Sequence, residues 1–134
     1  MPLEAFTDPW LNQWVAEIQS SESYRRSAAS WEWTLCLQVT DSEDTKAVFL
    51  DLWRGECRGA HMATDDDLST ADFVLAAPLD TWKLVLDSKL DPIFGVMTGK
   101  LKLARGNVAK LTPYMQASKD LVAAAAQIDT VFPD

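Results

Sequence analysis

Apolar and polar residues alternate one by one through two neighbouring stretches, and this pattern constrains the fold more than any other feature of the chain. In residues 31–39 tryptophan, leucine or valine occupies every second position, and residues 48–53 repeat the alternation. A period of two places successive side chains on opposite faces of a strand. The polar stretch Asp41-Ser42-Glu43-Asp44 between them favours a turn. The sequence therefore predicts a hairpin with one apolar face.

Weaker strand patterns continue this sheet. Gly55 allows a second turn, after which residues 57–63 predict a short strand. A polar loop is expected at Asp65-Asp66-Asp67. Residues 71–77 and 100–104 predict two further strands, so a sheet of about five strands is expected.

Helices are predicted wherever a proline follows a turn or capping residue and apolar residues then recur every three or four positions. The first helix starts at Asp8-Pro9, where the aspartate is expected to cap, and it ends near residues 20–23. Gly99 is expected to end the third helix, and the last one runs to about residue 128. The later helix starts are predicted at Pro78, Asp91-Pro92 and Thr112-Pro113.

Length and composition indicate one globular domain over residues 1–134. Apolar residues make up 48% of the chain and charged residues 24%, with no internal repeat and no linker. The chain has no run of 18 apolar residues and no basic stretch followed by an apolar one, so we expect a soluble cytoplasmic protein. Cys36 and Cys57 stand alone and are expected to be core thiols.

Several function classes are disfavoured by the residues. The net charge of −8 disfavours nucleic acid as a partner. The Asp65–Asp67 triplet lacks the spaced ligands and the glycine of a calcium loop, so no metal is expected. His61, the single histidine, lies in a weak strand, and Asp51 and Asp72 lie on polar strand faces. We therefore expect a protein that is not an enzyme, with no catalytic residue and no cofactor.

The second half of the chain resembles the sterol carrier protein-2 family. The family has a strand that opens with Ala-Asp, then Lys-Leu-x-Pro, Gly-Lys-Leu-Lys-Leu and a Gly-Asn or Gly-Asp turn. The strand at residues 48–55 is also similar to one of that family. The matching residues are Ala71-Asp72, Lys89-Leu90-Asp91-Pro92, Gly99-Lys100-Leu101-Lys102-Leu103 and Gly106-Asn107.

This resemblance implies an α+β fold of the sterol-carrier type: a roughly five-stranded mixed sheet covered on one face by helices around an apolar cavity. A filled core with no cavity is the alternative that the apolar pattern alone leaves open. The residues expected to line the cavity and bind a ligand are Trp14, Trp33, Leu35, Leu37, Leu50, Leu52, Phe73, Leu75, Trp82, Val85, Leu86, Ile93, Met97, Leu101, Leu103 and Met115.

The function that the resemblance implies is the non-catalytic binding and transfer of an apolar ligand. A fatty acid, an acyl thioester and a sterol-like molecule all remain open as ligands, as does a transient membrane contact. The alternative is an interaction or dimerisation module, with a homodimer as one form, because Phe49 and Trp53 are predicted on the sheet face away from the cavity.

Basic residues gather in the second half of the chain. Residues 1–80 carry 15 acidic and 5 basic side chains, whereas residues 81–134 carry 5 acidic and 7 basic ones. One hypothesis places Lys89, Lys100 and Arg105 at the cavity mouth, where they hold an anionic head group. The other is that these bases only protect an edge strand from pairing.

Overall fold

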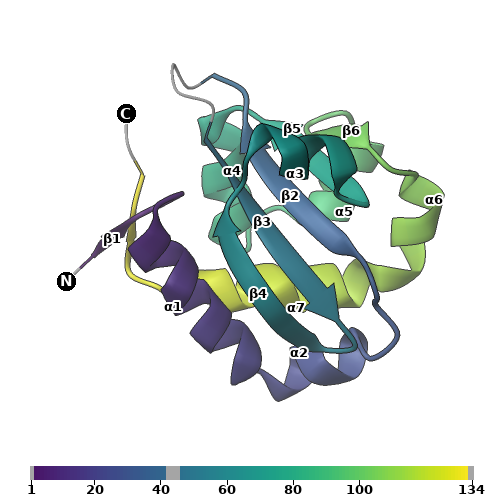
Figure 1. Cartoon of the computed structure of the whole chain (residues 1–134), viewed down its shortest axis with the longest axis horizontal. Coiled ribbons are helices and arrows are strands. Elements are labelled where there is room, and N and C mark those ends of the chain that lie inside the picture. Colours follow the sequence, from purple (N-terminus) through teal and green to yellow (C-terminus); the bar gives the residue numbers. More distant parts are fainter. Residues whose placement is uncertain (1, 42–45, 133–134) are drawn as a thin grey trace.

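A five-stranded mixed sheet organises the molecule in the computed structural model, which describes residues 2–41 and 46–132 (Figure 1). The strand order is β4-β3-β2-β5-β6; β2 and β5 are parallel and the other neighbours antiparallel. This confirms the predicted sheet. Its strands are β2 (Thr34–Val39), β3 (Lys46–Trp53), β4 (Glu56–Met62), β5 (Phe73–Ala77) and β6 (Lys102–Arg105).

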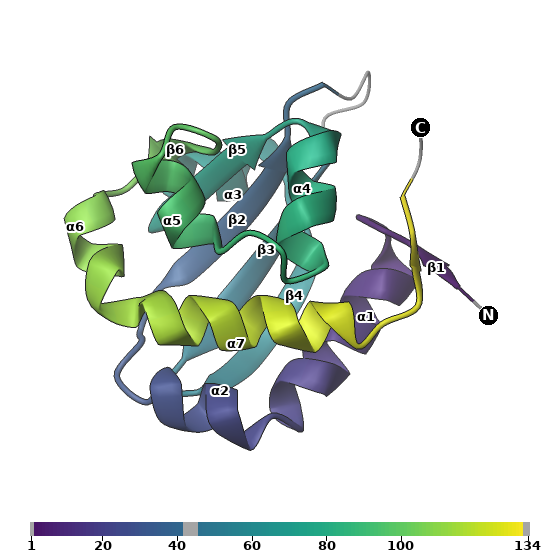
Figure 2. The same ribbon diagram turned by 180° about the vertical axis from the view of Figure 1, so that it is seen from behind.

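Helices pack mainly on one face of this sheet (Figure 2). Helices α1, α4, α5 and α7 lie on that face, and the apolar faces of the strands meet them in one continuous core. The short helix α3 lies on the opposite face (Figure 1). The helical elements are α1 (Asp8–Gln19), α2 (Glu22–Ser27), α3 (Asp65–Thr70), α4 (Leu79–Leu86), α5 (Pro92–Met97), α6 (Val108–Leu111), the 3₁₀ turn η1 (Thr112–Tyr114) and α7 (Met115–Ala126).

The predicted hairpin is formed by β2 and β3, which pair so that Leu35 faces Leu50. The first strand starts later than expected, at Thr34. Asp72 holds this start, since its carboxylate accepts hydrogen bonds from the backbone N–H of Thr34 (2.9 Å) and from its hydroxyl (3.1 Å). Residues 42–44 of the predicted turn lie outside the described part of the chain.

The acidic stretch after β4 was predicted to be a loop, and this is wrong. It forms α3, which begins with a reciprocal capping box. The Thr64 hydroxyl accepts from the Asp67 N–H (3.2 Å), and the Asp67 carboxylate accepts from the Thr64 N–H (2.9 Å). Two of the free N–H groups at the helix start are thereby paired, so a helix with no buried residue can form.

Two helical boundaries also differ from prediction. The polar stretch after α1 caps a second helix, because the Ser21 hydroxyl accepts from the Tyr24 N–H (3.2 Å) and α2 follows. The last helix restarts near Thr112-Pro113 as predicted, but a 3₁₀ turn, η1, which contains Pro113, separates α6 from α7. Proline lacks the N–H that a continuous helix needs there. The cap of α1 is Thr7 and not Asp8.

A small second sheet, which the alternation pattern did not predict, ties the two ends of the described chain together. Strands β1 (Leu3–Glu4) and β7 (Thr130–Val131) are parallel. The indole N–H of Trp10 in α1 donates to the Thr130 hydroxyl (3.1 Å). This contact fastens the end of the chain to α1.

The pKa of Asp67 predicts a pH-dependent contribution of α3. The hydrogen bond from the Thr64 N–H, with smaller contributions from the Thr64 and His61 side chains, holds the pKa of this carboxyl below its usual range. A lowered pKa in the folded state stabilises the fold above the unfolded pKa, and this stabilisation is lost as the pH falls through the folded pKa. We expect Asp67→Asn to lower the free energy of unfolding by about 0.5–1 kcal/mol at pH 7.

Urea denaturation of this variant and the parent at pH 7, 5, 4 and 3 measures the effect. The difference should shrink below about pH 4, where the parent carboxyl also becomes protonated. Asp66→Asn is the matched control, because Asp66 takes part in the hydrogen bonds of α3 through its backbone carbonyl. A constant difference at all four pH values would contradict this role of the Asp67 charge.

Within residues 2–41 and 46–132, every helix is too short or too polar to cross a bilayer.

Candidate ligand-binding cavity

An apolar cavity lies between the sheet and its helical cover. Strands β2, β3 and β5 form its floor with leucine side chains, and every helix of the cover contributes to its walls. Almost all of its lining is hydrocarbon or aromatic. The lining residues are Trp14, Tyr24, Trp31, Leu35, Leu37, Leu52, Leu75, Trp82, Val85, Pro92, Ile93, Leu111, Ala117, Ser118, Leu121 and Val122.

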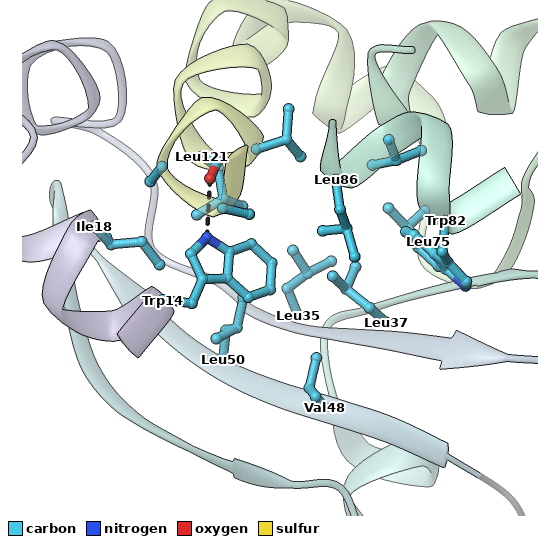
Figure 3. Packing of buried hydrophobic residues seen from close by; sticks show 14 of the residues in the cluster. Trp14, Ile18, Leu35, Leu37, Val48, Leu50, Leu75, Trp82, Leu86 and Leu121 are labelled. Carbon is cyan, nitrogen blue, oxygen red and sulfur yellow. Dashed lines mark hydrogen bonds between the residues drawn. The ribbon is translucent and has the colours of Figure 1, made fainter. Parts of the chain in front are cut away.

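Two fully buried tryptophans hold the walls in place. The indole N–H of Trp14 in α1 donates to the Leu121 carbonyl of α7 (3.0 Å; Figure 3). The indole N–H of Trp82 in α4 donates to the Gln38 carbonyl of β2 (2.9 Å). A buried indole N–H needs such a partner, so each ring combines apolar contact with one directed bond. These bonds fix α1 against α7, and α4 against the floor.

The cavity is narrow. The space between its side chains totals about 500 Å³, part of it open to solvent, but the centre of a water molecule reaches only about 30 Å³ of it. That is room for roughly two or three water molecules. A long-chain ligand would therefore require the walls of the cavity to move apart.

Eight of the sixteen residues predicted from the sequence line this cavity. They come from α1, from the floor and from the α4–α5 region. These residues are Trp14, Leu35, Leu37, Leu52, Leu75, Trp82, Val85 and Ile93.

The other eight predicted residues lie elsewhere. Leu50, Phe73, Leu86 and Leu101 are buried in the surrounding core and do not border the cavity. Trp33, Leu103 and Met115 are half-buried residues packed against that core. Met97 is 58% exposed at the surface of α5.

Eight lining residues were not predicted, although five of them belong to helices whose starts were predicted at Asp91-Pro92 and Thr112-Pro113. Tyr24 lies on helix α2, which was not predicted, and Leu111 ends the short helix α6 just before Thr112-Pro113. The spacing of four residues in α7 was a usable signal, since Ala117 and Leu121 recur on one helix face. The complete set is Tyr24, Trp31, Pro92, Leu111, Ala117, Ser118, Leu121 and Val122.

The basic residues considered for an anionic head group do not line the cavity. Lys89 and Lys100 are exposed, and Arg105 donates from Nε to the Ala71 carbonyl (2.7 Å). This bond fastens the edge strand β6 to the start of β5. The lining contains no charged side chain.

The chemically reactive side chains also lie away from a catalytic arrangement. Burial raises the pKa of Cys36 to about 12 and that of Cys57 to about 11, so both free thiols stay protonated at neutral pH. His61 stacks on Phe49 on the face opposite the cavity, with Nε2 2.8 Å from an Asp67 oxygen. In residues 2–41 and 46–132, no group of three or more His, Cys, Asp or Glu could hold a metal ion.

Phe49 and Trp53, the two aromatic residues on which the interaction-module hypothesis rests, pack against other side chains of the same chain. Phe49 packs with Leu68 of α3 in a small cluster on that face, besides its contact with His61. The guanidinium carbons of Arg58 and Arg54 lie 4.5 and 5.4 Å from the Trp53 ring centre. Neither ring forms a bare apolar patch.

Comparisons with known proteins agree with this architecture. A crystal structure of sterol carrier protein 2 superposes with a TM-score of 0.84 at 38% identity, over 93% of this chain and 99% of that one. A conserved hypothetical protein from Thermus thermophilus gives the same TM-score and identity over 96% and 92%. Sterol carrier protein 2 from Yarrowia lipolytica, in its apo form, shares the fold with a TM-score of 0.55 at 19% identity, over 84% and 88%.

The sequence comparisons identify the family. No curated protein sequence matches the chain. The profile of the SCP-2 sterol transfer family, however, matches residues 11–119, which include the whole five-stranded sheet and most of its helical cover. The chain belongs to the SCP-2 sterol transfer family.

Proposed function

We propose that the protein binds a lipid with a long apolar chain in this cavity and transfers it without chemical change. The observation that carries the proposal is the lining, in which apolar side chains from the floor and from every wall enclose one space. Burying ~300 Å² of an alkyl chain there contributes roughly 7 kcal/mol before the cost of moving the walls. Family membership supports the same function.

A variant that fills the cavity tests this proposal. Ala117 lies in the lining and is 2% exposed, so Ala117→Leu places three more carbon atoms in the narrow space. We expect its affinity for a fluorescent fatty acid to fall by about tenfold or more, because the added carbons occupy the volume that the chain needs. A fluorescence titration of delipidated protein measures this.

The matched control is Ala123→Leu, which makes the same change at an exposed position of α7. It should bind like the parent protein, and circular dichroism should show that both variants fold. Equal affinity of the two variants would contradict binding in this cavity. A native mass spectrum of the purified protein would also identify any lipid that stays bound to it.

Ligand exchange, we infer, takes place at an anionic membrane surface that the α4–α5 region contacts. Leu84, Phe94 and Met97 are exposed by 43%, 50% and 58%, and the neighbouring residues Pro92 and Ile93 line the cavity. The backbone of Lys89 bonds to the Leu84 carbonyl (2.9 Å) and that of Lys100 to the Gly95 carbonyl (2.8 Å). Lysines therefore flank the exposed apolar side chains, as in interfacial lipid-binding surfaces.

Charge complementarity supports this contact. Residues 83–110 carry six basic and two acidic side chains, in a chain whose net charge is −8. The acidic α3 lies on the opposite face of the sheet (Figures 1 and 2), so the α4–α5 face can approach an anionic surface with less repulsion.

Co-sedimentation with phosphatidylglycerol–phosphatidylcholine vesicles tests the membrane contact. Lys100→Ala should weaken binding to these vesicles about fivefold, because one lysine near an anionic surface contributes roughly 1 kcal/mol. Phe94→Ser should weaken it as well. Val131→Ser is the matched control, since Val131 is 48% exposed but lies near the end of the chain. Equal binding by all these variants would contradict the assigned surface.

A further inference from the structure

Two hydroxyl groups in the cavity lining have no hydrogen-bond partner. Tyr24 of α2 and Ser118 of α7 both line the cavity and are only 1% and 7% exposed. Within residues 2–41 and 46–132, neither side-chain hydroxyl takes part in a hydrogen bond. Among side-chain oxygens of the described residues that are completely inaccessible, only Asp91 Oδ1 lacks a hydrogen-bond partner. The two hydroxyl oxygens lack partners as well, so they cannot be completely inaccessible. The hydroxyls of Tyr24 and Ser118 therefore still border open space.

Several hydroxyl groups on less buried residues of this protein are paired. The hydroxyls of Thr98 and Thr112 each donate to the carbonyl four residues earlier, at 3.0 Å, which is the usual solution for such a side chain in a helix. The hydroxyl of Tyr114 pairs with that of Ser30 (3.0 Å). A buried hydroxyl without a partner destabilises a fold, so two of them in one apolar cavity require an explanation.

The two helices that carry these hydroxyls are joined directly. The Ser27 hydroxyl of α2 donates to the Asp120 carboxylate of α7 (2.7 Å). Tyr24 lies one helical turn before Ser27, and Ser118 lies two residues before Asp120. This bond holds the two hydroxyl-bearing segments on facing helices at one side of the cavity.

We infer that Tyr24 and Ser118 form a polar subsite that receives an uncharged head group bearing a hydroxyl or a carbonyl, in preference to a carboxylate. The inference rests on the proposed function of the cavity. Each hydroxyl can donate one hydrogen bond and accept another, which suits an alcohol or an ester carbonyl. No charged side chain lines the cavity, so a buried carboxylate would have only two neutral hydroxyl donors to offset the cost of burying its charge.

The protonation state of the tyrosine agrees with this preference. Burial, with a smaller contribution from Cys57, raises the pKa of Tyr24 above its usual value. The hydroxyl is therefore a neutral donor over the whole physiological pH range.

The experiment compares three ligands with one chain length: 1-hexadecanol, hexadecane and palmitate. Each displaces a fluorescent lipid from the parent protein, from Tyr24→Phe and from Ser118→Ala at pH 8. We expect each variant to bind 1-hexadecanol about threefold to tenfold more weakly, the effect of one hydrogen bond, and hexadecane with unchanged affinity. The parent should bind the alcohol more tightly than palmitate. Tyr114→Phe, which removes a hydroxyl outside the lining, should bind all three like the parent.

Thermal unfolding supplies a second measurement. Because the two hydroxyls lack partners, Tyr24→Phe and Ser118→Ala should unfold at the same temperature as the parent or higher. Equal losses for the alcohol and hexadecane, tighter binding of palmitate, or a clear fall in unfolding temperature would each overturn the subsite. If the parent binds none of the three ligands, the proposed function fails as well.

Discussion

Replacing Trp14 by alanine is expected to lower the free energy of unfolding by about 3–5 kcal/mol, the usual range for a buried aromatic residue. The Trp14 side chain is fully buried between α1, the sheet and α7 (Figure 3). Its ring centre lies 5.2 Å from that of Trp10, and its N–H donates to the Leu121 carbonyl. Alanine therefore removes a large part of the core and the bond between two walls of the cavity.

Two further variants separate these contributions in guanidinium denaturation followed by far-ultraviolet circular dichroism. Trp14→Phe keeps an aromatic ring but loses the indole N–H, so its loss should be smaller, about 1–2 kcal/mol. Trp53→Ala removes a half-buried ring that packs under two arginines on the opposite face, and about 1 kcal/mol is expected there. Similar losses for Trp14→Ala and Trp53→Ala would contradict the central place of Trp14 in the core.

The strands could be predicted from the sequence because their pattern has a period of only two residues. In β2 and β3 each apolar side chain has a polar or outward-facing neighbour, and the observed register pairs Leu37 with Val48 on the core face. Such alternation admits few other structures. The hairpin, and the sheet that extends from it, could therefore be predicted from the alternation.

Helices α2 and α3 could not be predicted from apolar periodicity. Helix α3 has no buried residue, and α2 buries only Tyr24. Both depend on hydroxyl side chains at their starts, Thr64 and Ser21, whose spacing to the residues they cap was readable in the sequence. These capping residues, and not the apolar periodicity, were the signal in the sequence that could have predicted α2 and α3.

The outline of the cavity was predicted only in part, for a different reason. Periodicity shows which side chains face the core, but not which of them border an unfilled space. Phe73 and Leu75 alternate on the same face of β5, yet only Leu75 lines the cavity. That difference depends on how other side chains pack above the strand. The space next to Phe73 is filled by the rings of Trp31 and Trp33, which contact it.

Gly55→Ala should be strongly destabilising, with an expected loss of about 3 kcal/mol or more. Arg54 and Gly55 form the two-residue turn between β3 and β4, with φ values of +48° and +84°. A type I′ hairpin turn needs positive φ at both positions, and glycine meets that need without strain. A Cβ atom at Gly55 would also lie 2.6 Å from the Arg25 carbonyl oxygen and 2.8 Å from its Cα.

Substitutions at two other glycines distinguish the effect of backbone strain at positive φ from the effect of the steric clash. Gly99 has φ +81° but no atom within 4 Å of an added Cβ, so Gly99→Ala should cost about 1–2 kcal/mol. Gly59 has neither positive φ nor a close neighbour, so Gly59→Ala should change stability by less than about 0.5 kcal/mol. Urea denaturation of the three variants should therefore rank Gly55 above Gly99 and Gly99 above Gly59.

The clash at Gly55 also connects this turn to the cavity. The atoms that an added Cβ would meet belong to the backbone of α2, next to Tyr24 in the cavity lining. Backbone atoms cannot rotate away, so α2 or the turn must shift. Any Gly55→Ala protein that still folds should bind 1-hexadecanol more weakly than Gly99→Ala does. A Gly55→Ala protein with the stability and the ligand affinity of Gly99→Ala would show that the turn and α2 are not in the contact described.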